Sequence, residues 1–125
     1  MGVPMIYAAS SVALAALELF VNVPHDIVKI AEFKRVDIYV PDSATIEYLE
    51  LSDLPDDWSN VIAPDSIGEI GRLWAKRCSS LVLRVPSAAI SGHEYNYLIN
   101  PRHPDICEVK ILGSSAFVHD PRMTP

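Results

Sequence analysis

The chain has 125 residues, of which 50% are hydrophobic and 21% are charged. This length and composition are typical of one compact globular domain with a buried core, and they exclude a fibrous or intrinsically disordered protein. The net charge of −6 comes without any block of Lys and Arg, which argues against direct binding of nucleic acid, because phosphate contacts need clustered cations.

The first predicted elements are a strand over residues 5–8 and a helix over residues 12–21, which Ser10 or Ser11 can cap. Glu18 is the only charged residue in this otherwise apolar helix. A carboxylate that leaves water needs a hydrogen-bond donor or a cavity, so we expect Glu18 to face a pocket. The alternative is that Glu18 lies on the solvent-facing stripe of an amphipathic helix.

The rest of the chain predicts several strands and one more helix. Residues 33–40 alternate, with Arg35 and Asp37 on one side and Val36 and Ile38 on the other, as in a half-buried strand. Asp65 or Ser66 can cap a second helix, which should end near residue 78. The further predicted strands are residues 46–51, 80–85, 95–99, 108–112 and 116–118.

Strands outnumber helices and do not alternate with them regularly. This order favours an α+β fold, with a mixed or antiparallel sheet, flanking helices and a single domain over residues 1–125. Residues 24–26 predict a break after the first helix. Along the whole sequence we expect no internal repeat and no linker between domains.

Cys78 and Cys107 lie far apart, with neither the spacing of a zinc site nor the density of a disulfide scaffold, so we expect reduced thiols. The N-terminal residues lack the basic region of a secretion signal. The apolar stretch that follows is interrupted by Ser10, Ser11 and Glu18 before it reaches membrane-spanning length. We therefore expect a cytoplasmic protein that does not enter a membrane.

Four polar residues from distant parts of the chain are site candidates: Tyr7, Glu18, Ser87 and Asn96. If the fold brings them together, one carboxylate with a phenol, a hydroxyl and an amide suits a sugar ring better than a metal ion. Each neutral candidate also has a structural explanation: Tyr7 as a core residue, Ser87 as a cap, and Asn96 as a loop residue that bonds its own backbone.

Two other kinds of site are disfavoured. We expect no metal, because the histidines are scattered, at His25, His93, His103 and His119. A hydrolase triad would need Ser87 in a tight turn flanked by glycines, and its neighbours are Pro86 and Ala88.

Four blocks of sequence resemble, in order and spacing, the successive motifs of the RES domain family. They are residues 2–10 (GVPMIYAAS), 13–18 (ALAALE), 85–88 (VPSA) and 96–104 (NYLINPRHP). Trp58 and residues 71–74 (GRLW) are also similar to that family, so the resemblance covers nearly the whole chain.

RES domains are named for an arginine, a glutamate and a serine. They are toxins of bacterial toxin–antitoxin pairs, their antitoxins carry an Xre-type helix-turn-helix, and their fold resembles ADP-ribosyltransferases. The resemblance implies that NAD is the substrate and that the bond between nicotinamide and ribose is cleaved, with water or a protein as the acceptor. It therefore implies an NAD glycohydrolase or an ADP-ribosyltransferase, with an Xre-type antitoxin as partner.

By this resemblance Glu18 matches the glutamate, Ser87 the serine, and Tyr7 a tyrosine of the site. Glu18 would stabilise the positive charge that develops on the ribose. Ser87 would bond the ribose or the amide, Tyr7 would bound the nicotinamide, and Asn96 would brace the pocket. The acidic surface could meet a basic segment of the antitoxin, and homodimerisation stays open because no stripe identifies an interface.

The sequence departs from the family at the arginine, which lies upstream of the block that starts here at Gly2. We therefore expect an N-terminally shortened RES domain. No arginine occupies the matching position, and only Arg102 lies in a site-associated block. An anionic dinucleotide binds poorly without a cation. The alternative function is a catalytically impaired RES-like module that binds an antitoxin.

Overall fold

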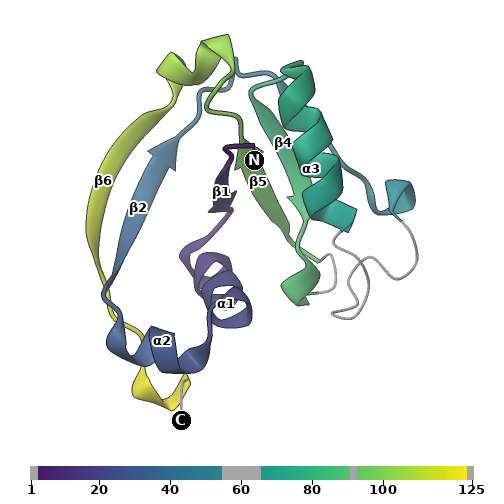
Figure 1. Ribbon diagram of the computed structural model, residues 1–125. Coiled ribbons are helices and arrows are strands. Elements are labelled where there is room, and N and C mark those ends of the chain that lie inside the picture. The colour runs from purple at the N-terminus through teal and green to yellow at the C-terminus, as the bar shows by residue number, and fades with distance from the viewer. Residues whose placement is uncertain (1–2, 55–65, 91–92, 124–125) are drawn as a thin grey trace.

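A computed structural model describes residues 3–54, 66–90 and 93–123. The fold consists of a mixed sheet with helices and a separate two-stranded ribbon (Figure 1). Trp58 and Asp65, named above, lie outside the described residues. The helices and strands of the described part are α1 (Val12–Asn22), α2 (His25–Ile30), α3 (Ser66–Arg77), β1 (Ile6–Ala9), β2 (Phe33–Tyr39), β3 (Ile46–Tyr48), β4 (Val82–Pro86), β5 (Tyr95–Ile99) and β6 (Lys110–Phe117).

The main sheet has four strands in the order β1-β5-β4-β3. β5 runs antiparallel to both β1 and β4, whereas β3 is parallel to β4. The predicted α+β class with a mixed sheet is confirmed.

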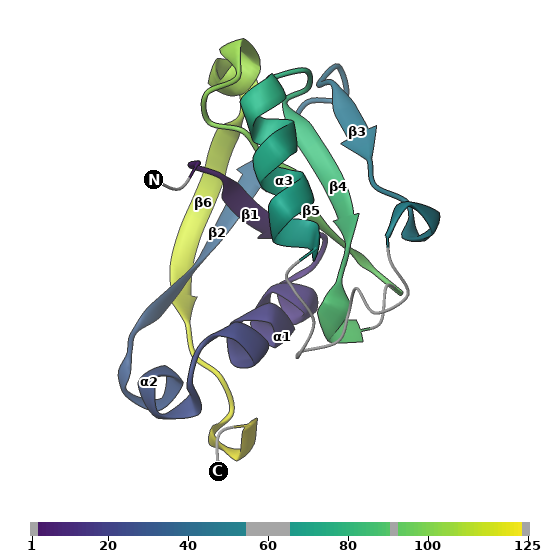
Figure 2. The same cartoon turned by 45° about the vertical axis from the view of Figure 1, so that its right-hand side comes forward.

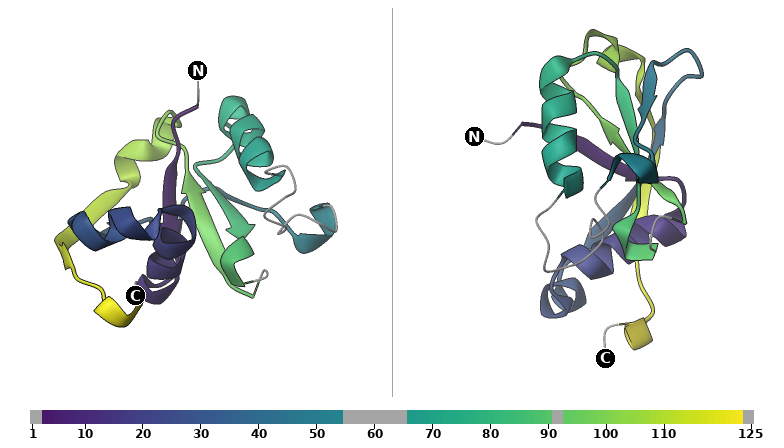
Figure 3. Two further views of the ribbon diagram at one scale, coloured as in Figure 1. Left: turned by 60° about the horizontal axis from the view of Figure 1, so that its bottom comes forward. Right: turned by 90° about the vertical axis from the view of Figure 1, so that its right-hand side faces the viewer.

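The first face of the sheet packs against α3, which lies along β4 and β5 (Figures 2 and 3). Trp74 is fully buried there against Leu83, Val85 and Leu98, which point to this face. Gly71 allows the close approach of the helix, because a Cβ at this position would lie 2.8 Å from Cδ1 of Leu98. This core fixes the position of the β4 and β5 ends that supply the site.

The opposite face of the sheet holds one end of the ribbon that β2 and β6 form. Val82 and Ile99 of the sheet are buried beneath Ile38 of β2 and Val109, which precedes β6. The ribbon then runs away from the sheet toward α2, and α1 lies between the two at that end (Figure 1). The ribbon, α1 and the sheet are thus brought to the same end of the molecule although they are far apart in the chain (Figure 1).

Most predicted elements are confirmed to within a few residues, and the strand at Tyr95–Ile99 has the predicted ends. Three details were wrong. The break predicted at residues 24–26 is shifted and shorter, because α1 ends at Asn22 and α2 begins at His25, so that only Val23 and Pro24 separate the two helices. β3 ends at Tyr48 instead of residue 51.

The third detail concerns β6. The two strands predicted at residues 108–112 and 116–118 are one strand, since residues 113–115 pair with β2 although Gly and Ser disfavour strands.

Candidate active site

Helix α1 positions Glu18. The Oγ of Ser11 accepts a 3.1 Å hydrogen bond from the backbone N–H of Leu14, which caps the helix, and Leu14 is buried beneath it. Glu18 lies four residues after Leu14, one turn further along the same side of the helix. A capped, anchored helix thus presents this carboxylate at a defined place.

The carboxylate of Glu18 accepts hydrogen bonds from three side chains. Oε1 accepts from Oγ of Ser87 at 2.6 Å and from Nδ2 of Asn96 at 2.8 Å. Oε2 accepts from Nδ2 of Asn22 at 3.1 Å, and the same amide donates to the backbone carbonyl of Glu18 at 2.8 Å. The ion pairs of the described residues do not include Glu18. Neutral donors therefore orient it and leave its charge uncompensated.

Ser87 and Asn96 come from neighbouring strands of the sheet. Ser87 directly follows Pro86, the last residue of β4, and its backbone N–H donates to the carbonyl of Glu94 at 2.9 Å. Asn96 of β5 is opposite Val85, so its side chain lies on the α3 side of the sheet, toward Glu18. Both donors are thus held by the sheet, while the acceptor is held by α1.

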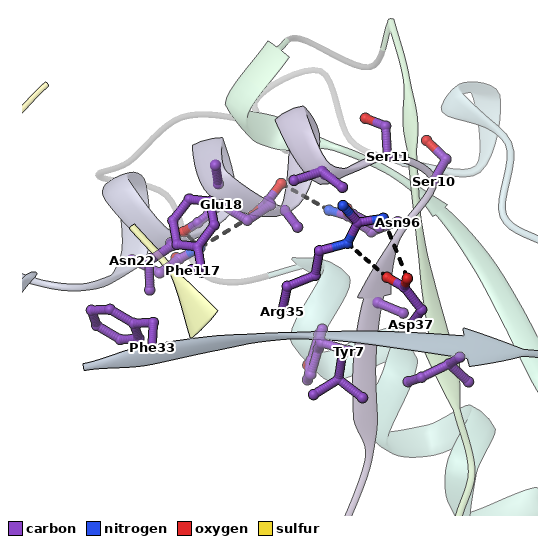
Figure 4. A pocket seen from close by; sticks show the side chains of 18 of the residues that line it. Tyr7, Ser10, Ser11, Glu18, Asn22, Phe33, Arg35, Asp37, Asn96 and Phe117 are labelled. Atoms are coloured by element: carbon purple, nitrogen blue, oxygen red, sulfur yellow. Dashed lines mark hydrogen bonds and ion pairs between the residues drawn. The ribbon is translucent and has the colours of Figure 1, made fainter. Parts of the chain in front are cut away.

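A pocket of about 1030 Å³ opens in front of Glu18, lined by α1, β1, β2 and the end of β4 (Figure 4). Tyr7, Glu18 and Asn96 line it. The structure thereby decides between the two interpretations of Glu18 in favour of the pocket. Tyr7 is 62% exposed, so its interpretation as a core residue is wrong.

Ser87 occupies a different place from the other three candidates. Its side chain is fully buried and does not line the pocket. Within the described residues, the one hydrogen bond of its side chain goes to Glu18. In this geometry Ser87 positions the carboxylate from behind instead of reaching a ligand.

The ribbon supplies the wall opposite α1. Phe33, Arg35 and Asp37 line the pocket at alternate positions of β2, and Phe117 of β6 lies directly across from Phe33. Nε of Arg35 donates to Oδ1 of Asp37 at 2.9 Å, and Nη2 donates to Oδ2 at 3.3 Å (Figure 4). These contacts raise the pKa of Arg35 above its usual value.

Several polar residues that line the pocket are not among the four predicted candidates, and Asn22 and Arg35 are two of them. Asn22 follows Glu18 by four residues on α1, and this helical spacing is a signal that could have identified it. Arg35 was placed on the correct side of its strand, with Asp37, but nothing local to that strand indicates that the ribbon folds over α1. Arg102, the arginine singled out from the sequence, is not among the residues that line the pocket.

Within residues 3–54, 66–90 and 93–123, no three His, Cys, Asp or Glu side chains are grouped closely enough to hold a metal ion. In the same described residues no helix has the length and apolar character needed to cross a membrane.

Comparison with known proteins gives the family. A model of the RES domain matches residues 1–122. The chain belongs to the RES domain family. The four sequence blocks that resemble RES motifs therefore lie in a true RES domain, and the resemblance is confirmed.

Relatives that are similar to this chain over most of its length are named toxins. This RES domain is 39% identical over 120 residues to "Toxin Res" of Yersinia enterocolitica (94% of this chain, 76% of the relative). It is 36% identical over 124 residues to "Prs ADP-ribosylating toxin" of Sphingobium sp. (98% and 76%). A second "Toxin Res", from Photorhabdus laumondii, is 36% identical over 104 residues (83% and 65%).

Proposed function

We propose that this RES domain is a toxin that cleaves NAD at the bond between nicotinamide and ribose. One observation carries the proposal: Glu18 lies on the pocket wall with its carboxylate oriented by Ser87, Asn96 and Asn22 and without a cationic partner among the described residues. A fixed, uncompensated negative charge is what a reaction that develops positive charge on a sugar requires.

In the proposed reaction the C1′–N bond breaks, and its electron pair leaves with nicotinamide. The ribose becomes oxocarbenium-like, and Glu18 stabilises it electrostatically. The oxygen of water then adds to C1′ and releases a proton, which gives ADP-ribose. Where a protein side chain replaces water as the nucleophile, the product is an ADP-ribosylated protein.

Two findings support this reaction class. The relatives bear the name toxin, and one of them is named an ADP-ribosylating toxin. The pocket combines Tyr7, the aromatic pair of Phe33 and Phe117, and one oriented carboxylate, which suits a ligand with flat rings and sugars.

The proposed partner is an antitoxin with an Xre-type helix-turn-helix. A toxin that consumes a central cofactor must be held inactive in the cell that makes it. The net charge of −6 suits a partner segment rich in Lys and Arg, because complementary charge speeds and orients association.

The direct test is nicotinamide release from NAD by the purified chain, with Glu18→Gln as the variant. We expect Glu18→Gln to fold normally and its turnover to fall by about 10²- to 10³-fold, the range for removal of one electrostatic catalytic group. Glu108→Gln is the matched control, because Glu108 is an exposed carboxylate outside the pocket lining.

Two results would overturn the proposal. Equal turnover by the wild type and Glu18→Gln would remove Glu18 from the mechanism. Folded wild-type chain that releases no nicotinamide would leave the antitoxin-binding module as the remaining function.

A further inference from the structure

We propose that Arg35 binds the diphosphate of the dinucleotide, so that the pocket side of β2 is the subsite for the anionic part of the substrate. This inference rests on the proposed function and adds to it a residue that binds the substrate. It is carried by the position of Arg35, by the geometry of its guanidinium group and by the charges of the pocket wall.

Arg35 lies across the pocket from Glu18. It comes from the ribbon, whereas Glu18 comes from α1, and Figure 4 shows the Arg35 side chain extending from β2 into the space between strand and helix. Lys34 also lines the pocket, but adjacent residues of a strand point to opposite faces. Arg35 is therefore the cation on the face that Phe33 and Asp37 share.

The guanidinium group has hydrogen-bonding capacity left for a ligand. Its contacts in the described part of the chain all go to Asp37, through Nε and Nη2. The N–H groups of Nη1 and the second N–H of Nη2 stay available. Two such N–H groups of a guanidinium match the oxygens of a phosphate group in a bidentate way. Arg35 can hold Asp37 along one edge and an oxyanion at the other.

Asp37 weakens this subsite. Glu18 and Asp37 are the acidic residues of the pocket lining, and Asp37 forms an ion pair with Arg35 at 2.9 Å. A diphosphate that enters must share the guanidinium with this carboxylate. Asp37 therefore lowers the affinity for the anionic part of the substrate, whereas Arg35 raises it.

A purely structural role of the pair gives a different expectation. The side chains of Arg35 and Asp37 are 47% and 49% exposed, and ion pairs at this exposure contribute little to stability. Both variants of the pair should therefore fold. If the pair only holds the ribbon in shape, removal of either partner should disturb the pocket in the same direction.

The test measures the Kd of ADP-ribose by calorimetry for the wild type, Arg35→Met and Asp37→Asn. We expect Arg35→Met to bind about tenfold or more weakly, as for loss of a charged hydrogen bond. We expect Asp37→Asn to bind about two- to fivefold more tightly, because one half-exposed like charge is removed. Binding by Arg35→Met should also depend less on salt.

Two controls isolate the diphosphate. Arg122 pairs with Asp120, two residues away, as Arg35 does with Asp37, but both residues lie outside the pocket lining. Arg122→Met should therefore leave the Kd of ADP-ribose unchanged. Nicotinamide riboside carries no phosphate, so its Kd should be equal for the wild type and Arg35→Met.

Three results would overturn the inference: an unchanged Kd of ADP-ribose in Arg35→Met, weaker binding in both pair variants, or no binding of ADP-ribose by the wild type. These results are distinct from failure of the proposed function, which is decided by Glu18-dependent nicotinamide release. If Arg35-dependent binding is found without nicotinamide release, the subsite stands and the reaction fails.

Discussion

The hydroxyl of Ser87 donates a 2.6 Å hydrogen bond to the carboxylate of Glu18, across 69 positions of sequence. The side chain of Ser87 is fully buried, whereas Glu18 lines the pocket, so the carboxylate separates the serine from any ligand. The pair acts as one unit, in which Ser87 sets the direction of the charge that Glu18 presents.

Ser87→Ala should lower kcat for nicotinamide release by about 10- to 100-fold, the equivalent of one hydrogen bond to a charged group. The Kd of ADP-ribose should stay the same, because Ser87 does not reach the pocket. Steady-state kinetics and calorimetry measure the two quantities. A Kd that rises while kcat is preserved would instead place Ser87 in direct contact with the substrate.

Ser87 and Asn96 should not act independently, because both donate to Oε1 of Glu18. In a double-mutant cycle with Ser87→Ala and Asn96→Leu, we expect the combined loss in kcat to differ from the product of the two single losses by at least about threefold. The same kinetic assay measures all four proteins. Strict multiplicativity would mean that the two donors do not share this carboxylate during turnover.

Asn22→Ala should have a much smaller effect than Ser87→Ala. Asn22 is exposed, so water can replace its amide as a donor to Oε2 of Glu18. We expect a fall in kcat of less than about fivefold, measured by nicotinamide release with circular dichroism to confirm an intact helix. A loss as large as that of Glu18→Gln would show that Asn22 contacts the substrate.

The hydrogen bonds to Glu47 should make the free energy of unfolding depend on pH in acid. Hydrogen bonds from Ser80 and Ser79 hold the pKa of Glu47 below its ordinary value of 4.5, although partial burial opposes them. Because the pKa is lowered in the folded state, this stabilisation is complete above pH 4.5 and is lost as the pH falls through the lowered pKa. The side chain of Glu47 is 42% exposed, so the effect is small.

The measurement is the free energy of unfolding in urea for the wild type and Glu47→Gln at neutral pH and well below pH 4.5. The wild type should be more stable at neutral pH, and this difference should shrink in acid. Glu108→Gln, at an exposed position, serves as the control for removal of a charge. A difference that is equal at both pH values would contradict the role of these hydrogen bonds.

Much of the fold could be predicted from local pattern. Ser11 and the apolar run after it predict α1, and the alternation before Asn100 predicts β5, because caps and periodicity act over a few neighbouring residues. The apolar surroundings of Glu18 in the sequence also favoured a pocket in front of its carboxylate, with a solvent-facing position as the alternative. Similarity to the RES family matched Ser87 and Tyr7, already candidates, to residues of a known site, although it did not show the way in which Ser87 contributes to it.

Local pattern and similarity to a known family were enough to predict the α+β class, the RES family and the four candidates of the site. The position of Ser87 behind Glu18, the continuity of β6 and the place of Arg35 at the pocket are seen only in the folded chain. Each of these features depends on contacts between segments that are distant in the sequence. Residues 113–115 have weak intrinsic strand propensity, and they form part of β6 because they pair with β2. Arg35 reaches the site only because the ribbon packs on the sheet beside α1.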